Sequence, residues 1–272
     1  MSNNDEVLQH IQDVELLILK DFIEICDENN LDYYLIYGTE IGAVRHQGFI
    51  PWDDDIDLIM FRDDYEKFLK VMEEKNCEKY TVFDIRYDEN YFFQFGRLSL
   101  NGTYWSEYWD KQVPFKLGIH VDLFILDKVP NNKIKRFIYM RRCLLLSKLC
   151  SISSIKVEYD VRAIEVVSNL LHSVINKIGL TPKYFQKKLP NLFRKYENQE
   201  CKYYADLTLN TLSCFKIEDF KPIKKAKFED IYANIPNNQE ATLGQVFGDY
   251  MQLPPEEERI GHGLNEVDFG KY

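Results

Sequence analysis

Residues 38–61 read GTEIGAVRHQGFIPWDDDIDLIMF, and this stretch decides the fold and the candidate site. Asp55 and Asp57 stand two apart at the start of an apolar run, IDLIMF, that predicts a strand. Successive strand side chains alternate between faces, so we expect these two carboxylates to project from the same face. Adjacent carboxylates repel each other, and a divalent cation such as Mg²⁺ or Mn²⁺ removes that conflict. A cation held this way takes substrate phosphates as further ligands, so the stretch indicates metal-assisted chemistry on a phosphate.

The residues just before the aspartates predict a phosphate cradle. The run YYLIY at 33–37 predicts a strand that ends at Gly38-Thr39, and IGAVRH predicts a short helix after it. Backbone N–H groups at such a turn bind anions, and Thr39 and Arg45 add a hydroxyl and a guanidinium. A solvated acidic turn explains the aspartates taken alone, but the adjacent glycine turn favours a site. The predicted substrate-binding residues are Gly38, Thr39, Arg45, His46 and Trp52.

A third carboxylate, Asp122, lies in the middle of the apolar strand predicted over GIHVDLFIL at 118–126. An aspartate inside a buried strand needs a partner or a metal. Two interpretations stay open: backbone donors or an arginine satisfy it, or it completes the metal set. His120 lies on the same face, and we expect it to be a structural neighbour. The predicted catalytic residues and metal ligands are therefore Asp55, Asp57 and Asp122.

Four blocks of the sequence resemble the LicD family, whose relatives include fukutin and fukutin-related protein: YGTEIGAVRHQGFIPWDDDIDLIM, IHVDLFILD, KFEDIYANIP and VFGDYMQLPPEEER. They span residues 37–259. The resemblance implies a nucleotidyltransferase core of the polymerase β type. It matches Gly38 and Thr39 to the glycine motif, Asp55 and Asp57 to the metal pair, and Asp122 to the third carboxylate. It assigns no role to the LPPEEER block.

The resemblance also implies a reaction. LicD-type relatives transfer phosphocholine from CDP-choline, or another CDP-activated alcohol phosphate, to a glycan. We therefore expect a metal-dependent enzyme that uses a CDP-activated donor, releases CMP and acts on a cell-surface glycan or its lipid-linked precursor. Two alternatives are a nucleotidyltransferase that releases pyrophosphate and a non-catalytic scaffold of glycan assembly. The presence of all three carboxylates argues against the scaffold.

A cluster of aromatic residues precedes Asp122 and offers a place for choline. Quaternary ammonium groups bind aromatic cages through cation–π attraction. Most such clusters are simply core, so both interpretations stay open, with Trp52 as another candidate. The cluster consists of Tyr104, Trp105, Tyr108 and Trp109.

The fold class predicted from the sequence is α/β (α+β), a mixed sheet core flanked by helices with a helical insertion. Apolar stripes predict helices over 6–27 and 63–74. Strands are predicted over 80–87 and 91–100, and the strand at 118–126 is expected to close the sheet. We divide the chain into a catalytic core at 1–130, a basic helical insertion at 131–200 and a C-terminal segment at 201–272.

The net charge of −10 is distributed unevenly along the chain. Residues 128–195 hold 15 Lys and Arg but only 3 Asp and Glu. Within them, KIKRFIYMRRCLLLSKLC mixes basic and apolar residues, which suits peripheral contact with an anionic membrane. A solvated helical subdomain packed against the acidic core explains the segment equally well. We expect no nucleic acid partner, because the other part of the chain is strongly acidic and no recognition motif appears.

The N-terminus MSNNDEVLQH is polar and carries no signal peptide pattern. The six cysteines show no paired CxxC spacing, so reduced thiols are expected. No run of 18 apolar residues occurs. The sequence therefore predicts a cytoplasmic protein, with peripheral contact, where it occurs, at the inner face of the cytoplasmic membrane.

Overall fold

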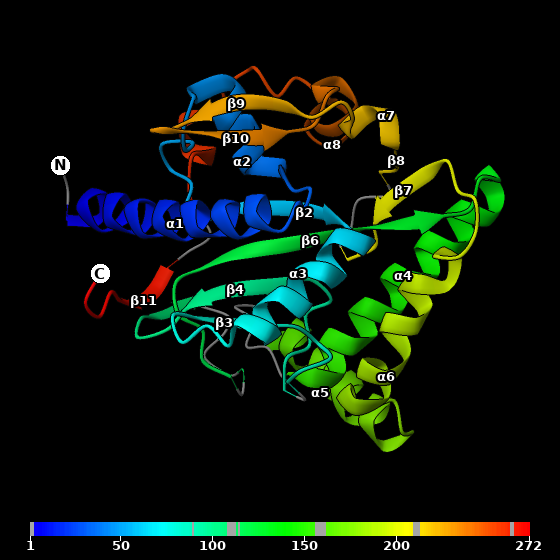
Figure 1. Ribbon diagram of the computed structural model, residues 1–272. Helices are drawn as coiled ribbons and strands as arrows, with labels where there is room; N and C mark the ends of the chain where they lie inside the picture. Colours follow the sequence, from blue (N-terminus) through cyan, green and yellow to red (C-terminus); the bar gives the residue numbers. More distant parts are fainter. Residues whose placement is uncertain are drawn as a thin grey trace.

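A mixed sheet forms the centre of the protein, and helices flank it, as the sequence predicts (Figure 1). The computed structural model describes residues 3–88, 90–107, 113, 115–155, 162–208, 213–261 and 264–272. The strands of the main path are, in spatial order, β1 (Tyr34–Leu35), β2 (Asp57–Phe61), β6 (His120–Val129), β4 (Gly96–Leu100) and β3 (Tyr80–Phe83). Strand β7 (Tyr203–Asp206) also pairs with β6, and β8 (Phe215–Lys216) pairs with β7. Strands β2 and β6 are parallel, and the other pairs of this sheet are antiparallel.

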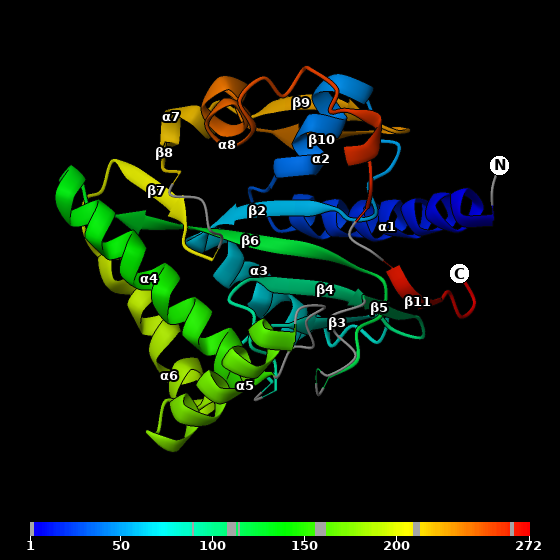
Figure 2. The ribbon, with the colours of Figure 1, turned by 180° about the vertical axis from the view of Figure 1, so that it is seen from behind.

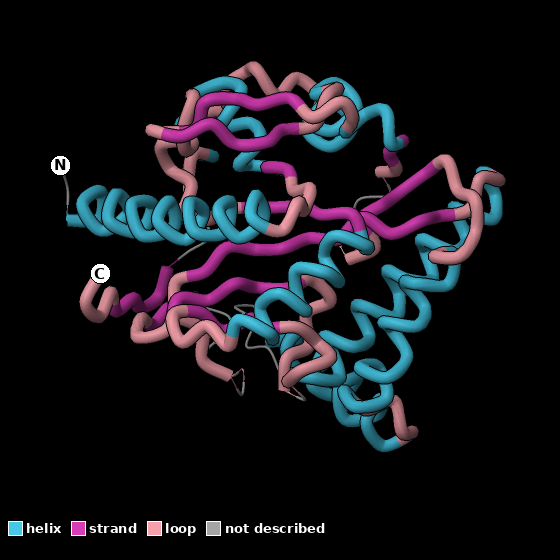
Figure 3. Tube along the Cα trace, viewed as in Figure 1, coloured by secondary structure: helices cyan, strands magenta, loops and turns pink. Residues whose placement is uncertain are grey.

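One face of the sheet is covered by helices α1 (Asn3–Glu28) and α3 (Arg62–Lys75) (Figures 1 and 3). Leu58, Leu98 and Leu123 point to this side and are fully buried in the main hydrophobic core. The helix predicted over 6–27 is confirmed, and its apolar stripe makes the contact. Because side chains alternate along each strand, the residues between these leucines face the opposite side.

The opposite face carries both apolar and charged side chains. Towards one end of β2 and β6, Ile59 and Phe124 pack in a smaller core with Tyr34 and Phe220, the last residue of α7 (Ile217–Phe220). Towards the other end of β2 and β6, the side chains on this face are polar or charged. The fold thus leaves a polar recess on this face of the sheet.

A hairpin fixes the loop that leads into the aspartates. Helix α2 (Tyr37–Ile41) continues into the π-helix η1 (Gly42–His46), which contacts β9 (Lys224–Phe228) of the hairpin formed with β10 (Ile231–Ile235). The backbone N–H of Phe49 donates to Glu229 Oε1 at 3.0 Å. A Cβ at Gly48 would displace the Glu229 carboxylate from this position. The hairpin and the loop are therefore fitted to each other.

The C-terminal part ends in a separate two-stranded sheet with β5 (Tyr104–Glu107). It contains the short helices η4 (Glu240–Gly244), α8 (Gln245–Phe247) and η5 (Glu256–Glu258) and the strand β11 (Leu264–Asp268). Strand β11 pairs antiparallel with β5, with Val267 opposite Trp105. The end of the chain thereby fixes the backbone that carries Trp105.

A helical layer lies beside the sheet (Figure 2). It contains α4 (Lys133–Ser154), α5 (Arg162–Lys177), α6 (Pro182–Phe193) and the 3₁₀ turn η3 (Arg194–Tyr196). Helix α4 packs against both α5 and α6. These helices share a hydrophobic core with residues near β4 and β6. The predicted division of the chain into three segments stays a prediction. Within the described ranges, no helix is both long and apolar enough to cross a membrane.

The strands predicted over 80–87 and 91–100 are shorter than expected, as β3 and β4. Two further strand predictions are wrong. The strand predicted over 33–37 is only the two residues of β1, because Tyr37 turns the chain with a φ of 50° and begins α2. The strand predicted over 118–126 does not close the sheet but lies in its middle, between β2 and β4. Strand order depends on pairing between distant segments, and the apolar pattern of one strand does not specify its neighbours.

Candidate active site

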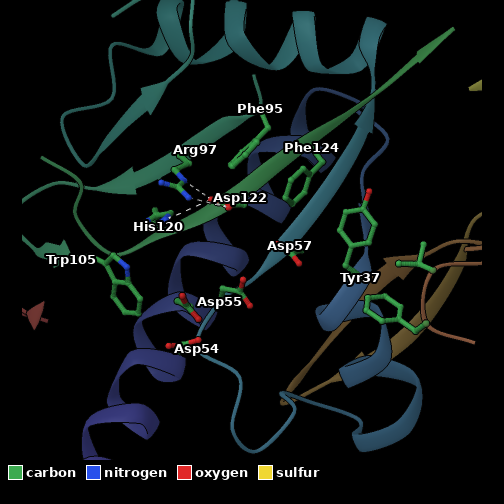
Figure 4. Close-up of a pocket in the computed structure, with 13 residues that line it drawn as sticks. Tyr37, Asp54, Asp55, Asp57, Phe95, Arg97, Trp105, His120, Asp122 and Phe124 are labelled. Atoms are coloured by element: carbon green, nitrogen blue, oxygen red, sulfur yellow. Dashed lines mark hydrogen bonds and ion pairs between the residues drawn. The ribbon is translucent and has the colours of Figure 1, made fainter. Parts of the chain in front are cut away.

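The polar recess forms a cavity of about 360 Å³ at the centre of the sheet (Figure 4). Its walls combine acidic side chains, aromatic side chains and one arginine, which come from α1, α2, β2, β4, β5, β6, α8 and the loops next to them. The lining residues are Glu15, Tyr37, Asp54, Asp55, Asp57, Phe95, Arg97, Trp105, His120, Asp122, Phe124, Val246 and Phe247. The structure therefore brings together Asp55, Asp57 and Asp122, as the sequence predicts.

The register of two parallel strands positions the central carboxylates. Asp57 is the first residue of β2, and it is paired with Asp122 of β6. Directly opposite residues project to the same face, so the two carboxylates are neighbours. Burial raises the pKa of Asp57 well above its usual range, and the nearby charges of Asp55 and Asp122 raise it further. The fold holds Asp57 where a proton or a cation is needed to compensate its charge.

Arg97 of β4 fixes the Asp122 carboxylate. Its Nε donates to Asp122 Oδ1 at 2.8 Å, and its Nη2 donates to Oδ2 at 3.4 Å (Figure 4). His120 Nε2 lies 3.6 Å from the same Oδ1. Burial, and then the charge of Arg97, lower the pKa of His120 to about 4, so this ring is neutral near pH 7. Two interpretations of Asp122 were left open by the sequence. The structure shows the one in which an arginine pairs with it.

Helix α1 contributes a carboxyl group that the sequence did not reveal as part of the site. Glu15 is 2% exposed, and its Oε2 has no hydrogen-bond partner within the described part of the chain. Burial raises the pKa of Glu15 well above its usual range, with Asp55 and Asp54 adding to the effect. One turn earlier, Gln12 Nε2 donates to the carbonyl of Asp53 at 2.8 Å. The helix thus holds the aspartate loop and adds a buried acid to the cavity.

Thr39 supports Asp57, and Tyr37 is anchored in the wall of the cavity. The Tyr37 hydroxyl donates to Asp206 Oδ2 at 2.9 Å, and the backbone of Tyr37 is left-handed, with a φ of 50°. Thr39 Oγ1 accepts the backbone N–H of Asp57 at 2.8 Å, and the side chain is 3% exposed. Thr39 therefore positions Asp57, and its predicted contact with a phosphate stays a prediction.

A second cavity of about 550 Å³ adjoins the first, because Tyr37, Asp55, Asp57 and Phe247 line both. The predicted substrate-binding residues that reach this second cavity are Gly38, Arg45 and Trp52. The two aspartates thus stand between two lobes of one cleft.

Glycine at position 38 allows a close approach within this wall. A Cβ there would lie 2.8 Å from Asp53 Oδ2, so Gly38 makes room for the Asp53 carboxylate. From the sequence, the turn at Gly38 was expected to direct backbone N–H groups towards a phosphate. The observed contact is with the protein, and phosphate binding by Gly38 stays a prediction.

Arg45 and Trp52 hold the C-terminal loop against the second lobe. Arg45 Nη1 donates to the carbonyls of Tyr250 at 2.7 Å and Gln252 at 3.2 Å. The Arg259 guanidinium lies over the Trp52 ring, 5.4 Å from its centroid. The LPPEEER block, to which no role was assigned, therefore forms part of this wall.

His46 lies behind the second lobe and does not line either cavity. Its ring stands edge-on to Trp52, with 6.4 Å between the ring centroids. Arg45 Nε donates to His46 Nδ1 at 3.4 Å. His46 therefore supports Trp52 and Arg45, and direct contact with a substrate stays a prediction.

The donor set fits a hard divalent cation at Asp55 and Asp57. Both offer carboxylate oxygens, and the buried Glu15 Oε2 faces the same cavity. Over the ranges that the structure describes, no group of three or more His, Cys, Asp or Glu side chains is arranged to hold a metal. Asp122 is engaged with Arg97, so its place among metal ligands stays a prediction.

Sequence reasoning missed Glu15 and Arg97 and set His120 aside. The only available signal was a charged residue within an apolar pattern: Glu15 on the helical stripe and Arg97 before Leu98. Of the predicted aromatic cluster, Trp105 lines the first cavity, and its Nε1 has no hydrogen-bond partner within the described residues. Tyr108, Trp109 and His262 lie outside the described residues.

Comparison with known proteins gives two kinds of match. A family model described as "LicD/FKTN/FKRP, nucleotidyltransferase domain" matches residues 30–141. The chain is 31% identical over 273 residues to the lipopolysaccharide cholinephosphotransferase LicD of Haemophilus influenzae, covering 96% of this chain and 97% of that protein. Shorter matches occur to uncharacterized proteins of Rickettsia prowazekii, 38% identical over 24% of this chain and 24% of that protein, and Rickettsia typhi, 42% identical over 20% and 18%. The family model ends within α4, whereas the Haemophilus match covers nearly the whole chain.

Proposed function

The chain belongs to the LicD family, and we propose that it transfers phosphocholine to a hydroxyl of a cell-surface glycan or of its lipid-linked precursor. The observation that carries this proposal is the pairing of Asp57 with Asp122 on the parallel strands β2 and β6, in a cavity on one face of the sheet. The Haemophilus relative, which is aligned over nearly the whole chain, is named for choline phosphate transfer to lipopolysaccharide. The proposed donor is CDP-choline, and the proposed core is a nucleotidyltransferase fold.

The proposed reaction is a displacement at phosphorus. The acceptor oxygen forms a bond to the phosphorus that bears choline, and the bond from that phosphorus to CMP breaks. Such reactions ask little covalent chemistry of the protein, and they depend on positioning and charge stabilisation. In this proposal Asp55 and Asp57 hold Mg²⁺ or Mn²⁺. When bound, that cation neutralises charge on the donor phosphates.

Asp122 takes the proton of the acceptor hydroxyl in this scheme. Arg97 holds both carboxylate oxygens on the side of the cavity next to Asp57. The neutral His120 ring limits rotation of the same carboxylate, since its Nε2 lies 3.6 Å from Oδ1. A positioned carboxylate within reach of the hydroxyl is the requirement for a general base.

The aromatic wall of the first cavity is the proposed choline subsite. Tyr37, Trp105, Phe124 and Phe247 line it together with the acidic side chains. Aromatic faces attract a quaternary ammonium group, and nearby carboxylates add a favourable charge. The second lobe, with Arg45 on its wall, then remains for the nucleotide part of the donor.

Phosphorus NMR on the purified chain with Mg²⁺ tests the reaction class and the donor together. The panel contains CDP-choline, CDP-ethanolamine, CDP-glycerol, CDP-ribitol and nucleoside triphosphates, each with and without a lipid-linked glycan. We expect CMP from CDP-choline, and none from a variant with Asp55→Asn and Asp57→Asn. Release of pyrophosphate from a triphosphate would replace the proposal by nucleotidyl transfer. Absence of any product with the full panel and acceptor would favour a scaffold.

A further inference from the structure

Helix α5 presents its apolar side to solvent. An ordinary surface helix turns this side towards the core. In α5 the polar residues face the protein instead: His172 Nδ1 bonds with the carbonyl of Ile152 at 2.8 Å, and Asn176 Nδ2 donates to that of Ser153 at 3.0 Å. Ile175 is buried beside them. The outward side chains, between 40% and 67% exposed, are Val166, Val167, Leu170, Leu171, Val174 and, just after the helix, Ile178.

This exposed stripe is long and continuous. Its members recur at helical spacing over more than three turns, from Val166 to Ile178. Contiguous apolar patches of this kind mark interaction sites, whereas single exposed apolar residues are ordinary. We call these six residues the α5 stripe.

Helix α4 packs against α5 (Figure 2). It combines exposed apolar and basic side chains. Phe137 is 53% exposed, and the Arg141 guanidinium lies 5.4 Å from the centroid of its ring. No acidic residue occurs in α4. Its exposed apolar residues are Ile134, Phe137, Ile138 and Leu145, and its exposed basic residues are Lys133, Lys135, Arg141, Arg142 and Lys148.

We propose that α4 and α5 together form a docking surface for a bilayer that contains anionic phospholipid. The α5 stripe offers apolar side chains to the acyl boundary, and the basic residues of α4 offer charge to the headgroups. The charge pattern selects this occupant: α4 carries basic residues from Lys133 to Lys148 and no acidic residue. In a two-fold dimer through this surface, the basic residues of the two copies would face each other and repel. The surface does not depend on the reaction proposed above.

Sedimentation with vesicles tests the surface directly. The protein is mixed with vesicles of phosphatidylcholine, with or without phosphatidylglycerol, at low and high salt. We expect binding to the anionic vesicles that weakens with salt. Replacing Arg141, Arg142 and Lys148 by Gln should weaken it about a hundredfold at low salt. Val167→Asp with Leu170→Asp and Val174→Asp should reduce it by about tenfold or more.

Matched controls separate docking from folding and from self-association. Tyr232→Asp with Ile217→Asp places acidic residues at two exposed apolar positions elsewhere and should bind as the parent chain does. A separate variant, Leu170→Trp, should show a blue shift of its tryptophan emission when anionic vesicles are added. Binding that survives the α5 changes, or no binding to any vesicle, would overturn the proposal. A dimer in light scattering that the α5 changes dissolve would instead assign the surface to a second copy.

Discussion

Asp57 and Asp122 lie opposite each other on the two parallel strands at the centre of the sheet, and Arg97 lies opposite Asp122 on the next strand. This row places two carboxylates and one guanidinium on one face. The arginine compensates Asp122, while burial and neighbouring charges raise the pKa of Asp57. The row therefore contains one carboxylate that is already paired and one whose charge needs a proton or a cation to compensate it.

Replacing Asp57 by Asn should abolish turnover and leave the fold intact. The amide cannot hold a cation as the carboxylate does, so we expect a loss of roughly a hundredfold or more in kcat. Thermal stability should stay equal or rise, because burying a carboxylate is costly. CMP release and the melting temperature are the two measurements. Asp230→Asn, at an exposed ion pair, is the control, and an active Asp57→Asn enzyme would contradict the assignment.

Arg97 and Asp122 should behave as a coupled pair. Arg97→Met leaves a poorly compensated carboxylate behind and should cost about 3 kcal/mol of unfolding free energy. Adding Asp122→Asn to that variant should recover part of the loss, and the double variant should still be inactive. Urea unfolding of the parent, both single variants and the double variant gives the coupling energy. Strictly additive losses would show that the contact does not stabilise the fold.

Arg45 should matter both for binding and for the order of the C-terminal loop. Arg45→Ala removes the hydrogen bonds to Tyr250 and Gln252, which should raise the KM for the donor about 10- to 100-fold. Limited proteolysis should show faster cleavage near this loop. Arg45→Lys separates the role of the positive charge from that of the loop hydrogen bonds. If the charge on a donor phosphate dominates, this variant should have the KM of the parent chain but should still be cleaved faster by the protease. Unchanged KM in both variants would exclude Arg45 from the donor site.

Glu40 should make stability depend on pH. It is fully buried, Thr242 Oγ1 donates to its Oε1 at 2.8 Å, and its Oε2 has no hydrogen-bond partner in the described chain. Burial raises its pKa well above the usual value, and the Thr242 bond only partly opposes this. The protonated form is therefore favoured in the folded state. Its contribution is complete below the unfolded pKa of about 4.3 and is lost as pH rises through the folded pKa.

Glu40→Gln tests that relationship. The amide cannot ionise, so the variant should not lose this contribution as pH rises. At neutral pH its melting temperature should exceed that of the parent, by roughly 2–4 °C for each kcal/mol recovered. The measurement is a series of thermal melts from acid to neutral pH. If the melting temperatures of the two proteins changed with pH in the same way across that range, the account of Glu40 as a buried acid would be contradicted.

Parts of the fold and site follow from the sequence because they are local. The stripe over 6–27 predicts α1, and the spacing of Asp55 and Asp57 predicts two acids in one cavity. The position of Arg97 could not be predicted in this way. It reaches Asp122 only through the pairing of β4 with β6, and that pairing is not encoded in either strand alone.

Glu15 illustrates a second limit. The periodicity of α1 specifies which side is buried, but it does not specify which part of that side faces a cavity instead of the core. Glu15 lies on the buried side near Val14 and Ile18, yet it lines the cavity. Likewise, the run at 33–37 has strand-forming residues, but α2 begins at Tyr37, whose hydroxyl bonds with the distant Asp206.

The parallel pairing of β2 with β6 also bears on how the protein reaches its active form. Asp57 and Asp122 are 65 positions apart, and the chain between them must form α3, β3, β4 and β5. Contacts between distant segments form late, because closing a long loop costs entropy before any pairing repays it. Local helices such as α1 require no such closure. We therefore expect a refolding chain to form local helices such as α1 before Asp57 and Asp122 come together.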